Sequence, residues 1–107
     1  MKSNNHQIGM TGTYLVAAQL SLHGFIATIT SRNAPAIDIL VYHPETSRTC
    51  GIQIKTTATT YKKDWTMDNP NKHANLFYVF VILDNSESEK HSFYVINSMD
   101  IPKLNDK

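Results

Sequence analysis

The run "NLFYVFVILD", residues 75–84, constrains the fold of this chain more than any other feature. Its eight central residues are all aliphatic or aromatic, without the alternation of apolar and polar side chains that marks a half-exposed strand. A continuous run of this length is typical of a strand that is buried on both faces. The sequence therefore predicts a central strand with neighbouring strands and packing on both faces.

Two further strand-like runs, 37–43 and 49–57, flank the turn sequence "PETS" and predict a β-hairpin. Facing residues are expected to have numbers that sum to 91, because one face is then wholly apolar. The polar face then holds Asp38, Gln53 and Lys55, whereas a slip by one residue would place Asp38 opposite an isoleucine. The predicted apolar pairs are Ile37 with Ile54, Ile39 with Ile52, and Val41 with Cys50; the polar face also pairs Ala36 with Lys55.

The segment "MTGTYLVAAQLSLHG" predicts a helix over about residues 10–23, with Thr11 as its N-cap and Gly24 just beyond its end. The other segments are predicted to be strands at 25–30 and 91–98, a loop at 58–74, and a short helix that has Ser98 as its cap and is limited by Pro102. The expected order is α-β-β-β-loop-β-β-(α), an α/β fold in one domain.

Composition limits the class of protein. The chain has 107 residues, enough for one core, and no apolar run approaches the 18 residues of a membrane span. Cys50 is the single cysteine and is expected to pack in the core, and residues 1–9 do not resemble a signal peptide. These features favour a cytoplasmic protein that does not enter a membrane.

The polar face of the hairpin carries groups suited to phosphodiester chemistry. The Asp38 carboxylate, the Gln53 amide oxygen and the backbone carbonyl of Ile54 are hard oxygen ligands of the kind that Mg²⁺ prefers. Lys55 could orient an attacking water and offset charge on a phosphate. Alternatively, Asp38 binds backbone N–H groups at the end of a loop, and Gln53 and Lys55 form the solvent face of an edge strand.

The order of elements, "Pro35-Ala-Ile-Asp38" at the start of a strand, and "Gln53-Ile-Lys55" across the hairpin resemble the PD-(D/E)xK nuclease superfamily, in a Gln-x-Lys variant. The resemblance covers about residues 9–83 and is nearest to Holliday-junction resolvase-like and small restriction-endonuclease-like members. It implies one restriction-endonuclease-like domain over residues 1–107, with a three-layer core and a mixed sheet at about 9–98.

The chain departs from the pattern of this superfamily at two positions. Related resolvases open the first helix with Gly-x-x-Gly-Glu, whereas this chain has "Gly9-Met-Thr-Gly12-Thr13". Thr13 therefore replaces a glutamate that reaches the metal, and Gln53 replaces the usual Glu or Asp. Asp38 remains as the single charged ligand.

The resemblance implies a Mg²⁺-dependent endonuclease or junction-resolving enzyme, with Mn²⁺ as a substitute ion and duplex or branched DNA as substrate. Asp38, Gln53 and Lys55 would be catalytic, and Asp38, Gln53 and Ile54 would hold the metal. The candidates for contacts to nucleic acid are Lys62, Lys63, Trp65 and Lys72. Taken alone, Trp65 is better explained as a core anchor for the loop, and the lysines as solvated charges.

Two other function classes stay open on the sequence. One is a weakened nuclease fold that binds nucleic acid or a protein partner. The other is a small structural or regulatory protein, which the net charge of +1 would suit. Because the chain ends soon after its last strand, a C-terminal helix or a partner subunit, as in a homodimer, could be needed to complete the cleft.

Overall fold

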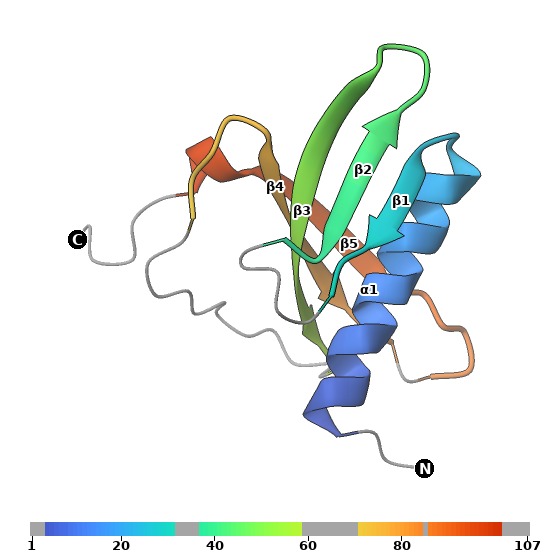
Figure 1. The fold of residues 1–107 in the computed structure, drawn as a ribbon. Coiled ribbons are helices and arrows are strands. Elements are labelled where there is room, and N and C mark those ends of the chain that lie inside the picture. Colours follow the sequence, from blue (N-terminus) through green and yellow to red (C-terminus); the bar gives the residue numbers. More distant parts are fainter. Residues whose placement is uncertain (1–3, 32–36, 59–70, 85, 102–107) are drawn as a thin grey trace, which may run out of the picture.

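The computed structural model describes residues 4–31, 37–58, 71–84 and 86–101 (Figure 1). The elements follow the predicted order and form an α/β fold with one α-helix and one five-stranded sheet. They are α1 (Asn5–Leu22), β1 (Ile26–Ile29), β2 (Ile39–His43), β3 (Arg48–Thr57), β4 (Leu76–Ile82), β5 (Ser92–Asn97) and the 3₁₀ helix η1 (Ser98–Asp100). The N-cap of η1 is Asn97, whose side chain accepts from the Met99 N–H, so the prediction of Ser98 as the cap is wrong.

The sheet is mixed and its strands lie in chain order, β1-β2-β3-β4-β5. Neighbouring strands are antiparallel except for β3 and β4, which are parallel. Strand β4 is buried along most of its length, as its apolar run predicts. Its Val79 and Val81 pack toward α1, whereas Leu76, Tyr78 and Phe80 form a second cluster on the opposite face.

Helix α1 begins five residues before the predicted start. Asn4 is the N-cap: its side chain accepts a hydrogen bond from the Gln7 N–H, and the Gln7 side chain accepts one from the Asn4 N–H. This reciprocal capping box satisfies two N–H groups that have no partner within the helix. Thr11 lies inside the helix and donates to the Gln7 carbonyl, so the prediction of Thr11 as N-cap is wrong. Gly24 follows the helix with a φ of 91°, as expected.

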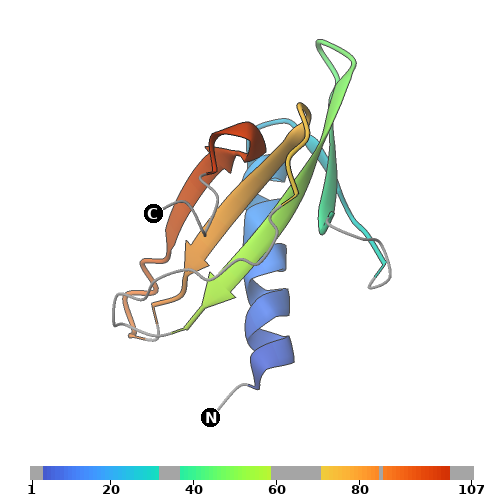
Figure 2. The same cartoon turned by 90° about the vertical axis from the view of Figure 1, so that its left-hand side faces the viewer.

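Helix α1 packs on one face of the sheet, mainly against β1 and β3 (Figures 1 and 2). The closest approach is at Gly12, where an added Cβ would lie 2.9 Å from the Thr56 Cβ. A single helix about 10 Å wide can cover about two strands spaced at ~4.8 Å. Within the part of the chain that the structure describes there is no second α-helix, so the third layer of the predicted core is not among the described residues.

The β2–β3 register agrees with the predicted sum of 91 from Ile39–Ile52 to His43–Arg48. It breaks at Asp38, whose N–H donates to the Ile52 carbonyl at 2.7 Å although Ile52 already faces Ile39. Asp38 and Ile39 thus both oppose Ile52, which is the arrangement of a β-bulge at the start of β2. The predicted pairing, with residue numbers that sum to 91, requires an uninterrupted ladder and therefore does not hold beyond Ile39.

The bulge moves Ile37 to the other face of the sheet. Ile37 packs with the cluster around Tyr78, and its Cδ1 would lie 3.1 Å from a Cβ added at Gly51. Ile54 instead packs with the cluster on the α1 side. The predicted pairing of Ile37 with Ile54 on one apolar face is therefore wrong.

Candidate functional site

Asp38 is held in place where β2 and β3 separate. Its N–H donates to the Ile52 carbonyl, and its own carbonyl accepts from the Thr30 N–H at 3.0 Å. Its side-chain Oδ2 accepts from the Ile54 N–H at 2.7 Å. Thr30 Oγ1 donates to the neighbouring Ile37 carbonyl at 2.6 Å. Backbone and side chain of Asp38 are both restrained, so the carboxylate is positioned before any ligand binds.

The partner of this carboxylate, Ile54, is the middle residue of Gln53-Ile-Lys55. The N–H and C=O of one strand residue point to the same side of the strand. The Ile54 carbonyl therefore points toward the side from which Asp38 approaches. The structure thus brings Asp38 to the backbone of the predicted motif on β3.

Gln53 and Lys55 point to the face opposite α1. Ile52 and Ile54 pack with the cluster beneath the helix, and successive strand residues alternate between faces. Both Gln53 and Lys55 are half-buried, and neither side chain is among the recorded contacts of Asp38. Within the described residues the predicted trio therefore meets through the Ile54 backbone, without a hydrogen bond or ion pair between its side chains.

Gln53 Oε1 is a buried acceptor without a hydrogen-bond partner among the described residues. A buried amide oxygen normally accepts a hydrogen bond, because its removal from water is otherwise uncompensated. Gln53 faces Tyr78 of β4, whose hydroxyl accepts from the Asn71 N–H at 2.9 Å and donates to the Asn71 carbonyl at 3.2 Å. These bonds place Asn71 on the side of the sheet that carries Gln53. Lys72, which is half-buried, follows Asn71 directly in the chain.

Thr13 lies on the other side of the sheet. It is buried in α1 next to Gly12, and its hydroxyl donates to the Gly9 carbonyl at 3.1 Å. Gly12 contacts Thr56, whose side chain alternates with that of Lys55 and faces the helix. The sheet therefore separates Thr13 from Gln53 and Lys55. Lys62, Lys63 and Trp65 lie outside the described residues.

The oxygen atoms at this site are hard ligands, and three of them suit Mg²⁺: the Asp38 carboxylate, the Gln53 amide and the Ile54 carbonyl. They supply one negative charge. Within 4–31, 37–58, 71–84 and 86–101, no three His, Cys, Asp or Glu side chains are grouped so that they could hold a metal ion. The unpartnered Gln53 oxygen fits such an ion, and the low charge predicts weak binding.

Cys50 has no part in this site. It packs half-buried against the cluster beneath α1, as predicted from its place in β3. Burial raises the pKa of its thiol, which lowers the fraction of reactive thiolate.

Thr30 was not singled out by the sequence, although its backbone N–H and its hydroxyl donate hydrogen bonds that position Ile37 and Asp38. The signal available was a threonine at the end of the strand-like run "FIATIT", where a hydroxyl can bond to neighbouring backbone. That signal cannot identify the partner, because the bonded residues are seven and eight positions away.

Fold and site together define an α/β protein with one helix on a five-stranded mixed sheet and a polar group where β2 and β3 separate. No family model, curated protein or solved structure matches the chain. In the described part of the chain, no helix combines the length and the apolar character needed to cross a membrane.

Proposed function

We propose that this chain is a Mg²⁺-dependent DNA endonuclease of the restriction-endonuclease-like fold, acting on duplex or branched DNA. One observation carries the proposal: the Asp38 carboxylate bonds to the backbone of the residue between Gln53 and Lys55. An acidic residue and a lysine-bearing motif that are distant in sequence thus meet at one point of the sheet.

Each group has a role in this proposal. Asp38, with the oxygens of Gln53 and Ile54, holds the metal. Lys55 binds the scissile phosphate, orients the attacking water and offsets charge on the phosphate. Lys72, with Lys62, Lys63 and Trp65, contacts the DNA backbone or bases. When bound, Mg²⁺ would polarise a phosphoryl oxygen and favour ionisation of a water molecule.

Cleavage of supercoiled plasmid and branched DNA, with Mg²⁺, Mn²⁺ or EDTA, tests the proposal. Asp38→Asn is the informative variant, because its amide oxygen can still accept the Ile54 N–H while the charge is lost. We expect Asp38→Asn and Lys55→Gln each to reduce cleavage by at least about 100-fold, the typical effect of removing a group that stabilises a transition state. Thermal unfolding of both variants checks that they remain folded.

Arg48→Gln is the matched control for Lys55→Gln. It removes one positive charge from the same strand, about 23 Å away along β3. Cleavage by Arg48→Gln should stay within about twofold of wild type, a small change beside the ~100-fold loss expected for Lys55→Gln. Cleavage that survives EDTA, or equal cleavage by wild type, Asp38→Asn and Lys55→Gln, would contradict the proposal.

The second candidate is a nuclease fold that binds DNA without cutting it. Two observations favour it. The site carries a single negative charge, and Thr13, which stands where related resolvases have a metal-binding Glu, donates its hydroxyl to the Gly9 carbonyl of its own helix. Here wild type binds DNA but does not cleave it, and Lys55→Gln weakens binding. DNA cleavage by Gln53→Glu with Mn²⁺ separates the candidates. Under either candidate the added carboxylate should tighten Mn²⁺ binding, measured by calorimetry, whereas cleavage above the wild-type level appears only if the remaining site is competent.

A further inference from the structure

Strand β5 forms one edge of the sheet and is paired with β4 alone. Edge strands expose unpaired backbone groups, and natural proteins protect them with charged residues, proline or bulges. The sequence "HSFYVIN", residues 91–97, contains no Lys, Arg, Asp, Glu or Pro. Its register with β4 is unbroken over all six residues. The edge thus lacks the usual features that prevent pairing with another strand.

Both faces of β5 are apolar and exposed. Relative exposure is 38% for Phe93, 54% for Tyr94, 66% for Val95 and 36% for Ile96. Phe93 and Val95 lie on the α1 side, and Tyr94 and Ile96 on the other. Four consecutive exposed hydrophobic residues on an edge strand are characteristic of an association surface.

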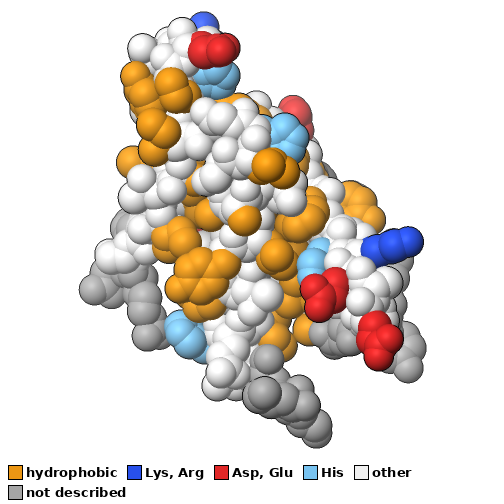
Figure 3. All heavy atoms as spheres, turned by 90° about the vertical axis from the view of Figure 1, so that its right-hand side faces the viewer, with side chains coloured by type: hydrophobic (Ala, Val, Ile, Leu, Met, Phe, Trp, Pro, Cys, Tyr) orange, Lys and Arg blue, Asp and Glu red, His pale blue; other side chains and the backbone are white. Residues whose placement is uncertain are grey.

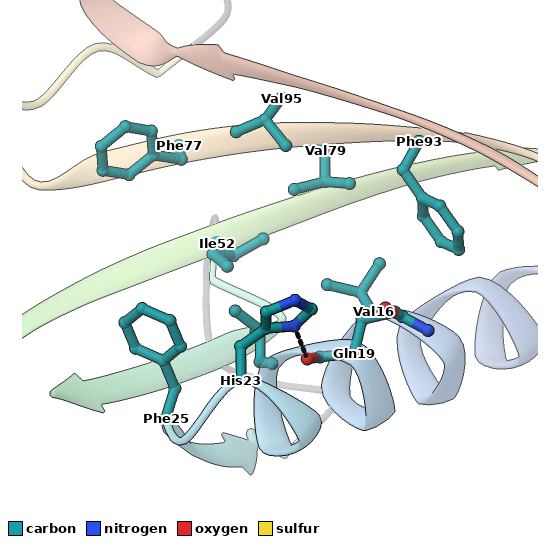
Figure 4. Close-up of a pocket in the computed structure, with 10 residues that line it drawn as sticks. Val16, Gln19, His23, Phe25, Ile52, Phe77, Val79, Phe93 and Val95 are labelled. Carbon is teal, nitrogen blue, oxygen red and sulfur yellow. Dashed lines mark hydrogen bonds between the residues drawn. The ribbon is translucent and has the colours of Figure 1, made fainter.

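An apolar groove of about 220 Å³ continues from β5 to the helix (Figure 4). It lies beside α1, which packs over β1 and β3 and buries Val79 of β4 but leaves β5 exposed. In Figure 4, side chains from the strands and the helix point into the space between them. Hydrophobic side chains are also spread over the face shown in Figure 3. The groove is lined mainly by Val16, Leu20, Ile52, Val79, Phe93 and Val95.

We propose that β5 and this groove form the interface of a two-fold homodimer, in which the β5 strands of two copies pair antiparallel. A two-fold axis perpendicular to the sheet keeps both α1 helices on the same side. Phe93 and Val95 of one copy then lie beside the same residues of its partner, and the two grooves join. The contact is self-complementary, as a closed dimer requires.

A second copy fits this surface better than the other occupants. The strand carries no charge, so identical strands meet without repulsion, and a nucleic-acid backbone finds no cation there. Residues 102–107 contain one large apolar residue, Leu104, and follow Ile101, which is buried on the face opposite the groove.

The exposed side chains of β5 supply nearly half of the area that a standard dimer interface needs. At about 150–250 Å² for a whole aromatic side chain, the exposed parts of Phe93, Tyr94, Val95 and Ile96 amount to roughly 350 Å². That is nearly half of the ~800 Å² that each partner buries in an interface of standard size. The strand backbone and the groove supply further area.

Sedimentation velocity over a range of protein concentrations tests the proposal. Wild type should reach twice the chain mass of 12.1 kDa. Val95→Lys places like charges on facing strands and should raise the dimer dissociation constant by at least about 30-fold. Ile26→Lys is the matched control: it adds the same charge to the opposite edge strand, at a residue 54% exposed, and should leave the dimer intact.

Hydrogen exchange of wild type gives a second readout that needs no variant. The β5 amides should become more protected as the concentration rises. A wild type that stays monomeric at about 100 µM, a concentration well above the dissociation constant of stable dimers, would overturn the proposal. The proposal would also be overturned if Ile26→Lys lost the dimer and Val95→Lys kept it, or if wild type formed open-ended oligomers. Protection of the β5 amides that does not depend on protein concentration would overturn it as well, because the chain itself would then protect the strand.

Discussion

Asp38 combines an observed structural contact with the role that we propose for it at the candidate site. Its carboxylate satisfies the Ile54 N–H where β2 leaves the ladder, which is the loop-end interpretation of this residue. The same contact brings the carboxylate to the backbone of Gln53-Ile-Lys55, as a site there requires. Asp38→Ala removes both roles at once, and for this reason Asp38→Asn is the better test of function.

Asp84 offers a pH-dependent prediction at the scale of one residue. Hydrogen bonds from the Ser86 hydroxyl and N–H, the Ser88 hydroxyl and the Lys90 N–H hold the pKa of its carboxyl well below the usual value of 3.8. As the pH falls through about 4, the unfolded chain takes up this proton before the folded chain does. The stability that Asp84 contributes is therefore present above pH 4 and is lost below it.

Asp84→Asn should consequently lose less stability than wild type between pH 6 and pH 3, measured by urea unfolding. Asp100→Asn is the control, since the Asp100 carboxylate accepts no hydrogen bond among the described contacts. Parallel acid profiles for wild type and Asp84→Asn would contradict the assignment.

At the scale of elements, the contact between α1 and β3 depends on Gly12. A methyl group there would overlap the Thr56 side chain, so Gly12→Ala should destabilise the fold by about 1–3 kcal/mol. Gly9 lies three residues earlier in the same helix with nothing within 4 Å of an added Cβ. Gly9→Ala should therefore stabilise the protein by ~0.5–1 kcal/mol through helix propensity.

Urea unfolding of the two variants measures the difference, and Thr56→Ala in the Gly12→Ala background should restore part of the loss. Equal effects of the two glycine substitutions would show that propensity alone decides them and that the close approach of α1 to β3 carries no weight.

For the molecule as a whole, charge and apolar surface are unevenly distributed. Residues 1–75 carry seven Lys or Arg and four Asp or Glu, and residues 76–107 carry three and five. The β5 edge in the second part is uncharged and apolar. This division favours nucleic-acid contacts in the first part and contacts between copies in the second.

The charge distribution predicts salt-dependent DNA binding. Each phosphate contact releases counterions and contributes about 0.9 to the slope of log affinity against log salt concentration. Replacing Lys62 and Lys63 together by alanine should therefore reduce that slope by about 1.8 if both contact phosphate, measured by fluorescence anisotropy from low to moderate salt. Lys90→Ala, in the β4–β5 turn, is the control. A slope that is unchanged in the double variant would exclude these lysines from the interface.

The sequence by itself determined the features that depend on local patterns. The apolar run 75–84 identified the buried strand β4, because a strand without polar alternation has no solvent face. The alternation in 39–52 set the hairpin register, because a slip of one residue would expose its core side chains. Gly24 marked the end of α1, because the backbone there adopts a positive φ.

The tertiary structure decided the features that depend on competition between distant groups. Asp38 and Ile39 both face Ile52, and the resulting bulge moved Ile37 to the other face, which no count of residues along one strand could reveal. One helix of 18 residues packs over β1 to β3 and buries Val79 and Val81 of β4, so β5 is left apolar and open on this face. Which strand is left open depends on where Gly12 allows α1 to approach β3, which is a matter of packing between elements rather than of local sequence.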